Sequence, residues 1–214
     1  MAEAPRSVES QVIHLRTVAP RVAIYPFGSA PPPVAPGWIA LAQLPQTPGL
    51  PAVFGDGTHA TTRLCAAAVD LFCRQRQPEA VLDVGTGTGV LARIARARGA
   101  RLIVGTDIDS VALSRAQAHA DLDAHPVAIQ FGSEAPDHWG ARFDLVVANI
   151  LEAPLHTLAP ALCRALIPGG LLLVSGFMRR QTPALRVLYE RAGLRFEGNS
   201  SLDEWAALTF ASMQ

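Results

Sequence analysis

Short apolar runs alternate with segments of helical hydrophobic spacing along most of the chain after residue 57. In Thr58–Gln75, for example, Leu64, Ala68 and Leu71 recur at the interval of one helix face. Buried strands are predicted at Ala80–Val84, Arg101–Thr106, Val127–Phe131, Phe143–Ala148 and Leu171–Ser175. Further helices are predicted at Val90–Arg98, from a Ser110 cap to about Leu122, and at about Leu155–Leu166 and Thr182–Ala192. This alternation is typical of a parallel sheet with helices on both faces.

The C-terminal end of the chain breaks this alternation. Two last strands, near Leu194–Glu197 and Trp205–Ala211, follow each other without a helix between them, which predicts an antiparallel hairpin. The expected fold is therefore α/β and Rossmann-like, with a seven-stranded, mostly parallel sheet that ends in this hairpin.

The segment before the first helix has a different composition. Prolines are concentrated in Pro20–Pro51, around apolar runs at Arg21–Tyr25 and Gly37–Leu44, and a further short strand is expected at Gln11–Val18. Because proline cannot donate to a strand ladder, the two apolar runs are predicted to be edge strands or a proline-stiffened hairpin. We therefore divide the chain into residues 1–53, an N-terminal extension with a proline-rich linker or lid, and residues 54–214, the α/β domain.

The charge balance argues against nucleic acid and against a charged membrane surface as partners. The chain has 18 basic and 18 acidic residues, so its formal net charge is zero. Four arginines lie close together, at Arg93, Arg96, Arg98 and Arg101. The first three are interpreted as the solvated face of one helix rather than as an RNA site.

No segment indicates export, a membrane span or a metal site. The N-terminal residues lack an apolar signal region, and no apolar run reaches the length of a bilayer span. Cys65, Cys73 and Cys163 are scattered, and the histidines do not have the spacing of metal ligands. We therefore expect a soluble, cytoplasmic protein with no metal, no nucleic acid and no membrane as partners.

The most informative motif is VLDVGTGTG at Val81–Gly89, where a hydrophobic strand runs into three alternating glycines and then a helix. Glycine at such a turn permits tight backbone geometry and close approach of a ligand. A dinucleotide site has the spacing G-x-G-x-x-G, whose third glycine would fall where this chain has Val90. The simplest alternative is a tight turn without a ligand.

Two acids extend the motif. Asp83 stands two residues before the first glycine, where a carboxylate repels a pyrophosphate and attracts an ammonium group. Asp107 ends the second strand, at the position where an acid accepts both hydroxyls of a ribose. A nucleoside with an ammonium group and no diphosphate describes S-adenosylmethionine better than NAD.

Three residues are candidates for handling a methyl acceptor. Asn149 follows an apolar strand, and its amide would hold an amine; the alternative is a helix cap before Pro154. His59 is either a base for an ammonium substrate or, the reading we favour, a hydrogen-bonded residue that shapes the cofactor pocket. Glu152 is by default a surface carboxylate.

At this point the chain resembles the class I methyltransferases and, within them, the ribosomal protein L11 methyltransferases. The motifs that carry the resemblance are FGDGTHATT at Phe54–Thr62, the glycine loop with GTDID at Gly105–Asp109, and VVANIL at Val146–Leu151. The family pattern has Thr where Asp56 stands, and it includes an N-terminal domain that grips the ribosomal protein. Only about fifty residues precede Phe54, so we expect that domain to be missing.

The resemblance implies a class I methyltransferase fold and N-methylation of a protein, on lysine side chains or an N-terminal amine, by S-adenosylmethionine. Residues 54–214 would form the methyltransferase domain. Cofactor contacts are expected at Thr62, Asp83, Gly85, Gly87, Gly89, Asp107, Ile108 and Asn149. Asn149 would also position the substrate, and His59 is the second catalytic candidate. The alternatives are methylation of a different protein or a small molecule, and a non-catalytic module that binds S-adenosylmethionine.

Overall fold

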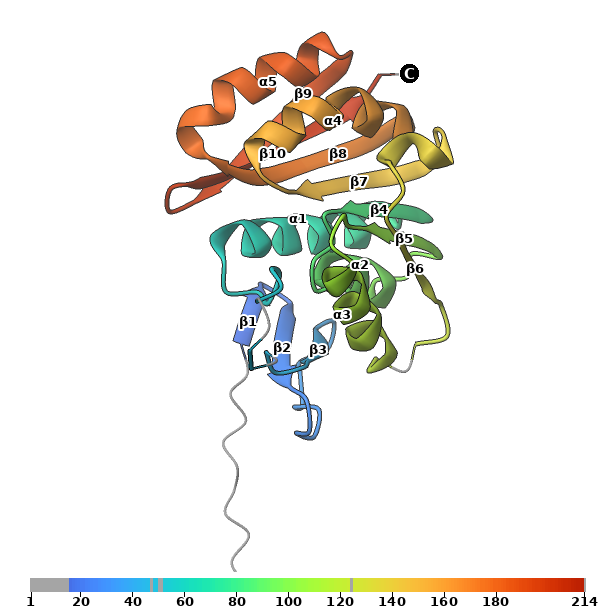
Figure 1. The fold of residues 1–214 in the computed structure, drawn as a ribbon, viewed down its shortest axis with the longest axis vertical. Coiled ribbons are helices and arrows are strands. Elements are labelled where there is room, and N and C mark those ends of the chain that lie inside the picture. Colours follow the sequence, from blue (N-terminus) through green and yellow to red (C-terminus); the bar gives the residue numbers. More distant parts are fainter. Residues whose placement is uncertain (1–15, 47, 50–51, 124, 214) are drawn as a thin grey trace, which may run out of the picture.

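The centre of the protein is a seven-stranded sheet with the strand order β6-β5-β4-β7-β8-β10-β9 (Figure 1). The computed structural model describes residues 16–46, 48–49, 52–123 and 125–213. The strands of this sheet are β4 (Ala80–Val84), β5 (Leu102–Thr106), β6 (Ile129–Gly132), β7 (Phe143–Asn149), β8 (Leu166–Met178), β9 (Leu194–Leu202) and β10 (Trp205–Ser212). β10 pairs antiparallel with both β8 and β9, whereas the pairs from β6 to β8 are parallel. The predicted fold class is confirmed.

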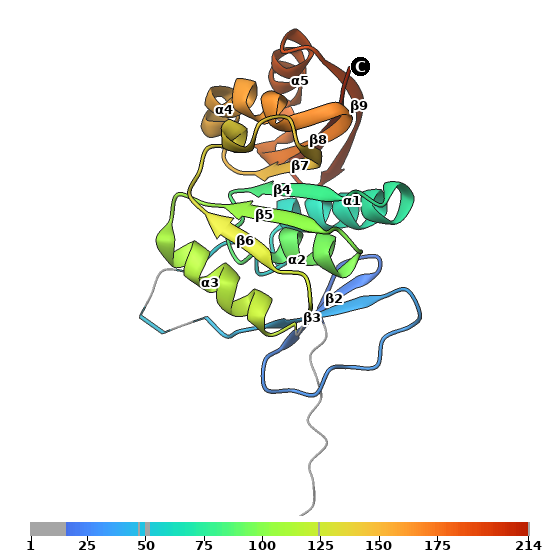
Figure 2. The same ribbon diagram turned by 90° about the vertical axis from the view of Figure 1, so that its right-hand side faces the viewer.

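Helices cover both faces of this sheet (Figure 2). They are α1 (Ala60–Arg76), α2 (Val90–Ala97), α3 (Ser110–Asp121), α4 (Glu152–Ala165) and α5 (Thr182–Arg191), with short 3₁₀ turns at Pro136–Trp139 and Arg179–Gln181. One hydrophobic core joins α1 and α2 to residues such as Val81 and Ile103, and the other joins α4 and α5 to residues such as Leu82 and Val104. Neighbours along a strand face opposite cores, which explains the continuous apolar runs.

A second, three-stranded sheet lies beyond α1, α2 and α3, at the opposite end of the molecule from α4 and α5. It consists of β1 (Arg16–Ala19), β2 (Val22–Pro26) and β3 (Ile39–Gln43). β2 and β3 pair in parallel, so the hairpin alternative for these two runs is wrong. Of the predicted edge strands, β3 is one, whereas β2 lies between β3 and β1 and pairs antiparallel with β1. Residues 11–15 of the strand expected at Gln11–Val18 lie outside the described residues.

The small sheet shares the core of the large one. Val22, Ile24 and Leu41 are buried in the cluster that also contains Val69 of α1 and Ile94 of α2. Burial of these side chains removes apolar surface from water, which is the main stabilising contribution in folding. Strands β2 and β3 therefore pack as part of the same hydrophobic core as α1 and α2.

Two predictions about side chains are wrong. Arg93 and Arg96 are buried, not solvated: both donate to Asp123, which lies beyond α3, and Arg98 pairs with buried Asp70 of α1. A helical pattern places charged residues on a surface, but it contains no information about a carboxylate about thirty residues away. The cap of α3 is Asp109 rather than Ser110, because the Asp109 side chain accepts from the backbone N–H of Val111.

None of the helices within the described ranges is long and apolar enough to cross a membrane. The same ranges contain no group of three or more His, Cys, Asp or Glu side chains arranged to hold a metal ion.

Candidate functional site

The loops that follow β4, β5 and β7 meet at the carboxyl end of the large sheet. The register pairs Asp83 of β4 with Gly105 of β5 and with Val147 of β7, so the residues after these three positions are neighbours. The chain crosses to β5 on one side of β4, whereas β7 lies on the other side. Ligands of open α/β sheets bind at such a reversal of strand order.

The glycine loop has the geometry that its sequence predicts. Gly85, Gly87 and Gly89 have φ angles of +70°, +54° and +77°, which side-chain-bearing residues rarely adopt. A Cβ on Gly85 would collide with the side chain of Ile150, and one on Gly87 would collide with the carbonyl of Phe54. Glycine is therefore required here because other protein segments pack closely against the loop.

Asp83 lies beneath this loop and organises it. Its side chain is 1% exposed, and Oδ2 accepts hydrogen bonds from the Thr86 hydroxyl at 2.7 Å and from the Ala92 backbone N–H at 3.2 Å. The other carboxylate oxygen, Oδ1, has no partner. Burial raises the pKa of Asp83 to about 6, although the hydrogen bond from Thr86 opposes this shift. The site thus contains a buried acid that a neighbouring cation would stabilise in its charged form.

Asp107 and Ile108 form the next part of the site, directly after β5. The half-buried Asp107 carboxylate accepts from the backbone N–H of Gly87 and from that of Asp109, both at 3.0 Å. It thereby joins the glycine loop to the start of α3. Ile108 is 100% exposed. A fully exposed isoleucine beside a half-buried acid offers apolar and polar contacts to one ligand.

Thr62 and Asn149 bring two more polar atoms to this end of the sheet. Thr62 is 1% exposed and Asn149 is 9% exposed, and neither Thr62 Oγ1 nor Asn149 Oδ1 has a partner. Buried polar atoms in native proteins are nearly always hydrogen-bonded, so these two are available to a ligand. Asn149 is not a helix cap, because α4 begins after Leu151.

Gly176, which was not among the residues predicted for the site, supports the segment after Asn149. Gly176 has a φ angle of +97°, and a Cβ there would collide with the carbonyl of Ile150. The Ile150 N–H also donates to Ser175 of β8 at 3.2 Å. Ile150 is thus confined between Gly85 and Gly176, which fixes the position of Asn149. No local motif marks Gly176.

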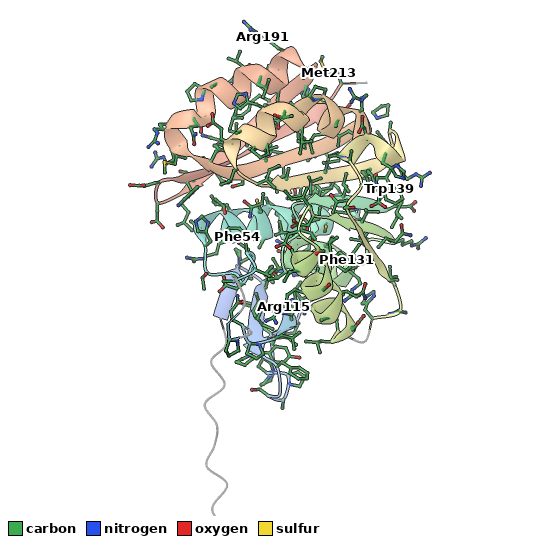
Figure 3. The ribbon with its side chains drawn as sticks, viewed as in Figure 1. Phe54, Arg115, Phe131, Trp139, Arg191 and Met213 are labelled. Atoms are coloured by element: carbon green, nitrogen blue, oxygen red, sulfur yellow. The ribbon has the colours of Figure 1, made fainter. Side chains whose placement is uncertain are left out.

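His59 caps α1 and lies between two aromatic rings. Its Nδ1 accepts from the backbone N–H of Thr61 at 3.3 Å and lies 2.8 Å from the Thr61 hydroxyl. The ring centroids of Phe54 and Trp205 are 5.1 Å and 4.6 Å from that of His59, both edge to face. Figure 3 shows Phe54 beside the beginning of α1. The sequence reasoning missed Trp205 because only the folded chain brings β10 to this helix.

These features define the class of the fold. A glycine loop without the third dinucleotide glycine, acids at Asp83 and Asp107, and a sheet in which β10 alone runs antiparallel are the arrangement of the class I methyltransferases.

The family follows from comparison with known proteins. The family model for ribosomal protein L11 methyltransferase (PrmA) matches residues 21–213. The ribosomal protein L11 methyltransferase of Hydrogenovibrio crunogenus is 38% identical over 165 residues, which are 76% of this chain and 53% of that protein. That of Syntrophotalea carbinolica is 36% identical over 184 residues, or 83% and 59% of the two chains. This chain therefore belongs to the ribosomal protein L11 methyltransferase family.

A solved structure supports the same family. The ribosomal protein L11 methylase from Lactobacillus delbrueckii subsp. bulgaricus superposes with a TM-score of 0.81 at 27% identity, covering 94% of this chain and 100% of that one. The chain nevertheless spans only about half the length of the curated relatives that it matches.

Proposed function

We propose that this chain is an S-adenosylmethionine-dependent methyltransferase that binds its cofactor at the carboxyl ends of β4, β5 and β7. One observation carries the proposal. Asp83 Oδ1, Asn149 Oδ1 and Thr62 Oγ1 are buried oxygens without partners. Asp83 and Asn149 lie at the carboxyl ends of the paired strands β4 and β7, and Thr62 lies in the first turn of α1. Leaving such atoms unpaired is costly, and a polar ligand would satisfy them.

The residues fit the parts of S-adenosylmethionine. Asp107 would accept the ribose hydroxyls, and the exposed side chain of Ile108 would contact the adenine. Asp83 is the negative group for the ammonium, and the N-terminal end of α1 with Thr62 suits the carboxylate. The two acids, Asp83 and Asp107, do not suit a diphosphate.

Methyl transfer from a sulfonium to an amine needs little general acid–base catalysis. When bound, the cofactor supplies a methyl group already activated by a sulfonium. The work of the chain is to align an uncharged amine and to exclude water. Asn149 Oδ1 would accept an N–H of that amine and so orient its lone pair.

We assign His59 to shaping the pocket rather than to removing a proton. Its Nδ1 lone pair caps α1, so the proton of the neutral ring lies on Nε2, which then is a donor. The rings of Phe54 and Trp205 beside it would line the acceptor side of the pocket. Methylation of an uncharged amine yields an alkylammonium product, which binds well to such rings.

For the substrate we propose a protein amine, a lysine side chain or an N-terminus, with ribosomal protein L11 as the first candidate. Two points support this substrate. The chain belongs to a family of protein methyltransferases, and methyl transfer to an amine needs no chemical group beyond those found at the site. A ribosomal protein substrate would put the reaction in the cytoplasm, which we include in the proposal. The second candidate is a different protein or a small molecule. We further propose that residues up to Val53 serve as linker and border of the acceptor pocket.

The experiment is transfer of a radiolabelled methyl group to purified L11 and to fractions of a lysate from a strain lacking this protein. All 18 basic residues of the chain are arginine, so methyl-lysine in the reaction cannot arise from self-methylation. We expect label in a protein band, and labelled L11 would identify the substrate. Label only in small molecules would overturn the protein proposal, and bound cofactor without any label would indicate a non-catalytic module.

A pair of glycine variants tests the assigned site through a calorimetric measurement of S-adenosylmethionine affinity. Gly87→Ala would push against the Phe54 carbonyl and lower cofactor affinity more than tenfold, because both strain and displacement of the loop oppose binding. Gly99→Ala is the matched control, since Gly99 has a φ angle of +102° but no atom within 4 Å of its Cβ position. Equal affinities in the two variants would place the cofactor elsewhere.

A further inference from the structure

Thr88, in the glycine loop, is a junction of three segments. Its N–H donates to the Phe54 carbonyl at 2.9 Å, and its hydroxyl donates to the Gly55 carbonyl at 2.6 Å. Its carbonyl lies 3.1 Å from Nδ1 of His119, a fully buried residue in the last turn of α3. Each polar group of Thr88 is therefore used to hold the loop against another part of the protein.

The Thr88 carbonyl lies outside helix α2 and accepts from His119 instead of from a helical N–H. Gly89 is the N-cap of α2, and its carbonyl accepts the first helical bond, from the Arg93 N–H at 2.9 Å, so the Thr88 carbonyl is not part of the helical ladder. The Ala92 N–H, which has no helical partner at this position, donates to Asp83 Oδ2. A buried carbonyl without a donor costs about 1–3 kcal/mol. The His119 ring supplies the missing donor from a different helix.

The surroundings of His119 keep the ring neutral and select its tautomer. Burial and the neighbouring Arg93 and Arg115 lower the pKa of His119 to about 4. A neutral ring that faces a carbonyl with Nδ1 carries its proton there. Nε2 is then an unprotonated nitrogen, and no partner reaches it in the described structure. A charged ring would lie among cations, which explains why a histidine is kept neutral in this position.

We propose that His119 is a positioning residue for the cofactor: by donating from Nδ1 to the Thr88 carbonyl, it holds the glycine loop in its binding-competent form. The inference rests on the proposed cofactor site, but it concerns the loop itself and is testable without turnover. It also links α3 to the Phe54–Gly55 segment through a single residue, Thr88.

Three substitutions at His119 and one control test the proposal. The side-chain amide nitrogen of His119→Asn takes the place of Nδ1, that of His119→Gln takes the place of Nε2, and His119→Leu has no donor. The control is Tyr189→Phe, which removes another buried donor, from the Tyr189 hydroxyl to the Leu155 carbonyl at 3.0 Å, in the core on the other face. Calorimetry measures S-adenosylmethionine affinity, and hydrogen exchange of the Gly87 and Gly89 amides measures the loop in the unliganded protein.

We expect His119→Leu and His119→Gln to weaken cofactor affinity about tenfold and to speed loop exchange, because the Thr88 carbonyl loses its partner. His119→Asn should restore most of the cofactor affinity and most of the slow loop exchange, and Tyr189→Phe should leave the affinity and the exchange rate unchanged. Wild-type values in His119→Leu, or no recovery in His119→Asn over His119→Gln, would overturn the proposal. If His119→Leu does not fold, the Asn and Gln variants decide. If the wild type binds no S-adenosylmethionine, the proposed function fails, and loop exchange still decides the role of His119.

Discussion

Asp83 shows how one residue combines structural and ligand-binding roles. Its Oδ2 holds Thr86 and the start of α2, while Oδ1 is left without a partner in a buried position. Burial raises the pKa to about 6, so near neutral pH the unliganded protein carries a buried negative charge. An ammonium group beside the carboxylate would offset much of the free energy that is needed to bury this charge.

The first prediction concerns the pH dependence that Asp83 creates. Its folded pKa of about 6 exceeds the ordinary value of 3.8, so its stabilising contribution is complete below pH 3.8 and is lost as the pH rises through 6. Asp83→Asn should remove this loss, changing the free energy of unfolding relative to wild type by about 2 kcal/mol between pH 4 and pH 7. Urea denaturation at several pH values measures the difference.

The same substitution tests the cofactor contact. In the wild type, S-adenosylmethionine affinity should increase as the pH rises through 6, because the carboxylate becomes available to the ammonium. The Asn variant should bind more weakly and lose this dependence. Asp121→Asn, an exposed acid on α3, is the control for loss of one negative charge. Parallel pH profiles for wild type and Asp83→Asn would exclude an ammonium contact at Asp83.

At the scale of elements, arginines attach the small sheet to the helices of the large one. Arg93 Nη2 donates to the Ala42 carbonyl at 2.8 Å, Arg98 Nη1 to Gly37 at 2.9 Å, and Arg115 Nη2 to Leu44 at 2.9 Å. Figure 3 shows Arg115 between α3 and the small sheet. These arginines thus hold protein segments together, so the arginines of α2 do not form a solvated basic surface.

The second prediction compares a buried and an exposed arginine of the same sequence cluster. Arg93→Met should lower the free energy of unfolding by about 2–4 kcal/mol, because Asp123 and the Ala42 carbonyl lose a buried partner. Arg101→Met, on the exposed Arg101, should change it by less than about 0.5 kcal/mol. Urea denaturation of both variants provides the measurement. Similar small effects would mean that the Arg93 pairs contribute nothing net to stability.

At the scale of the whole molecule, the large sheet is packed between two hydrophobic cores, and the proposed cofactor site lies at the carboxyl ends of three of its strands. A ligand that bridges β4, β5 and β7 binds the folded protein and not the unfolded chain, in which these strand ends are apart. Its binding must therefore stabilise the fold as a unit.

The third prediction follows from this coupling. S-adenosylmethionine at one hundred times its Kd should stabilise the protein by about 2.7 kcal/mol, which for a domain of this size raises Tm by roughly 5–10 °C. NAD at the same concentration should leave Tm unchanged, since the loop lacks the third glycine of a dinucleotide site. A thermal shift with NAD and none with S-adenosylmethionine would reverse the cofactor assignment.

Local patterns in the sequence determined much of the fold. Apolar runs predicted the strands of the large sheet, because a parallel strand buried on both faces must be continuously hydrophobic. The glycine spacing predicted a tight turn after β4, and Gly85, Gly87 and Gly89 make that turn with left-handed φ angles that few other residues adopt. Motifs also placed Asp83, Asp107 and Asn149 at strand ends, and the topology of a parallel sheet brings such ends together.

The tertiary structure decided the features that depend on residues far apart in the chain. The parallel pairing of β2 with β3, the burial of Arg93 against Asp123, the contact of Trp205 with His59 and the bond from His119 to Thr88 have no local signal. The physical reason is that periodicity and turn chemistry act over a few residues, whereas burial and hydrogen-bond partners are set by whichever segments the packed core places side by side.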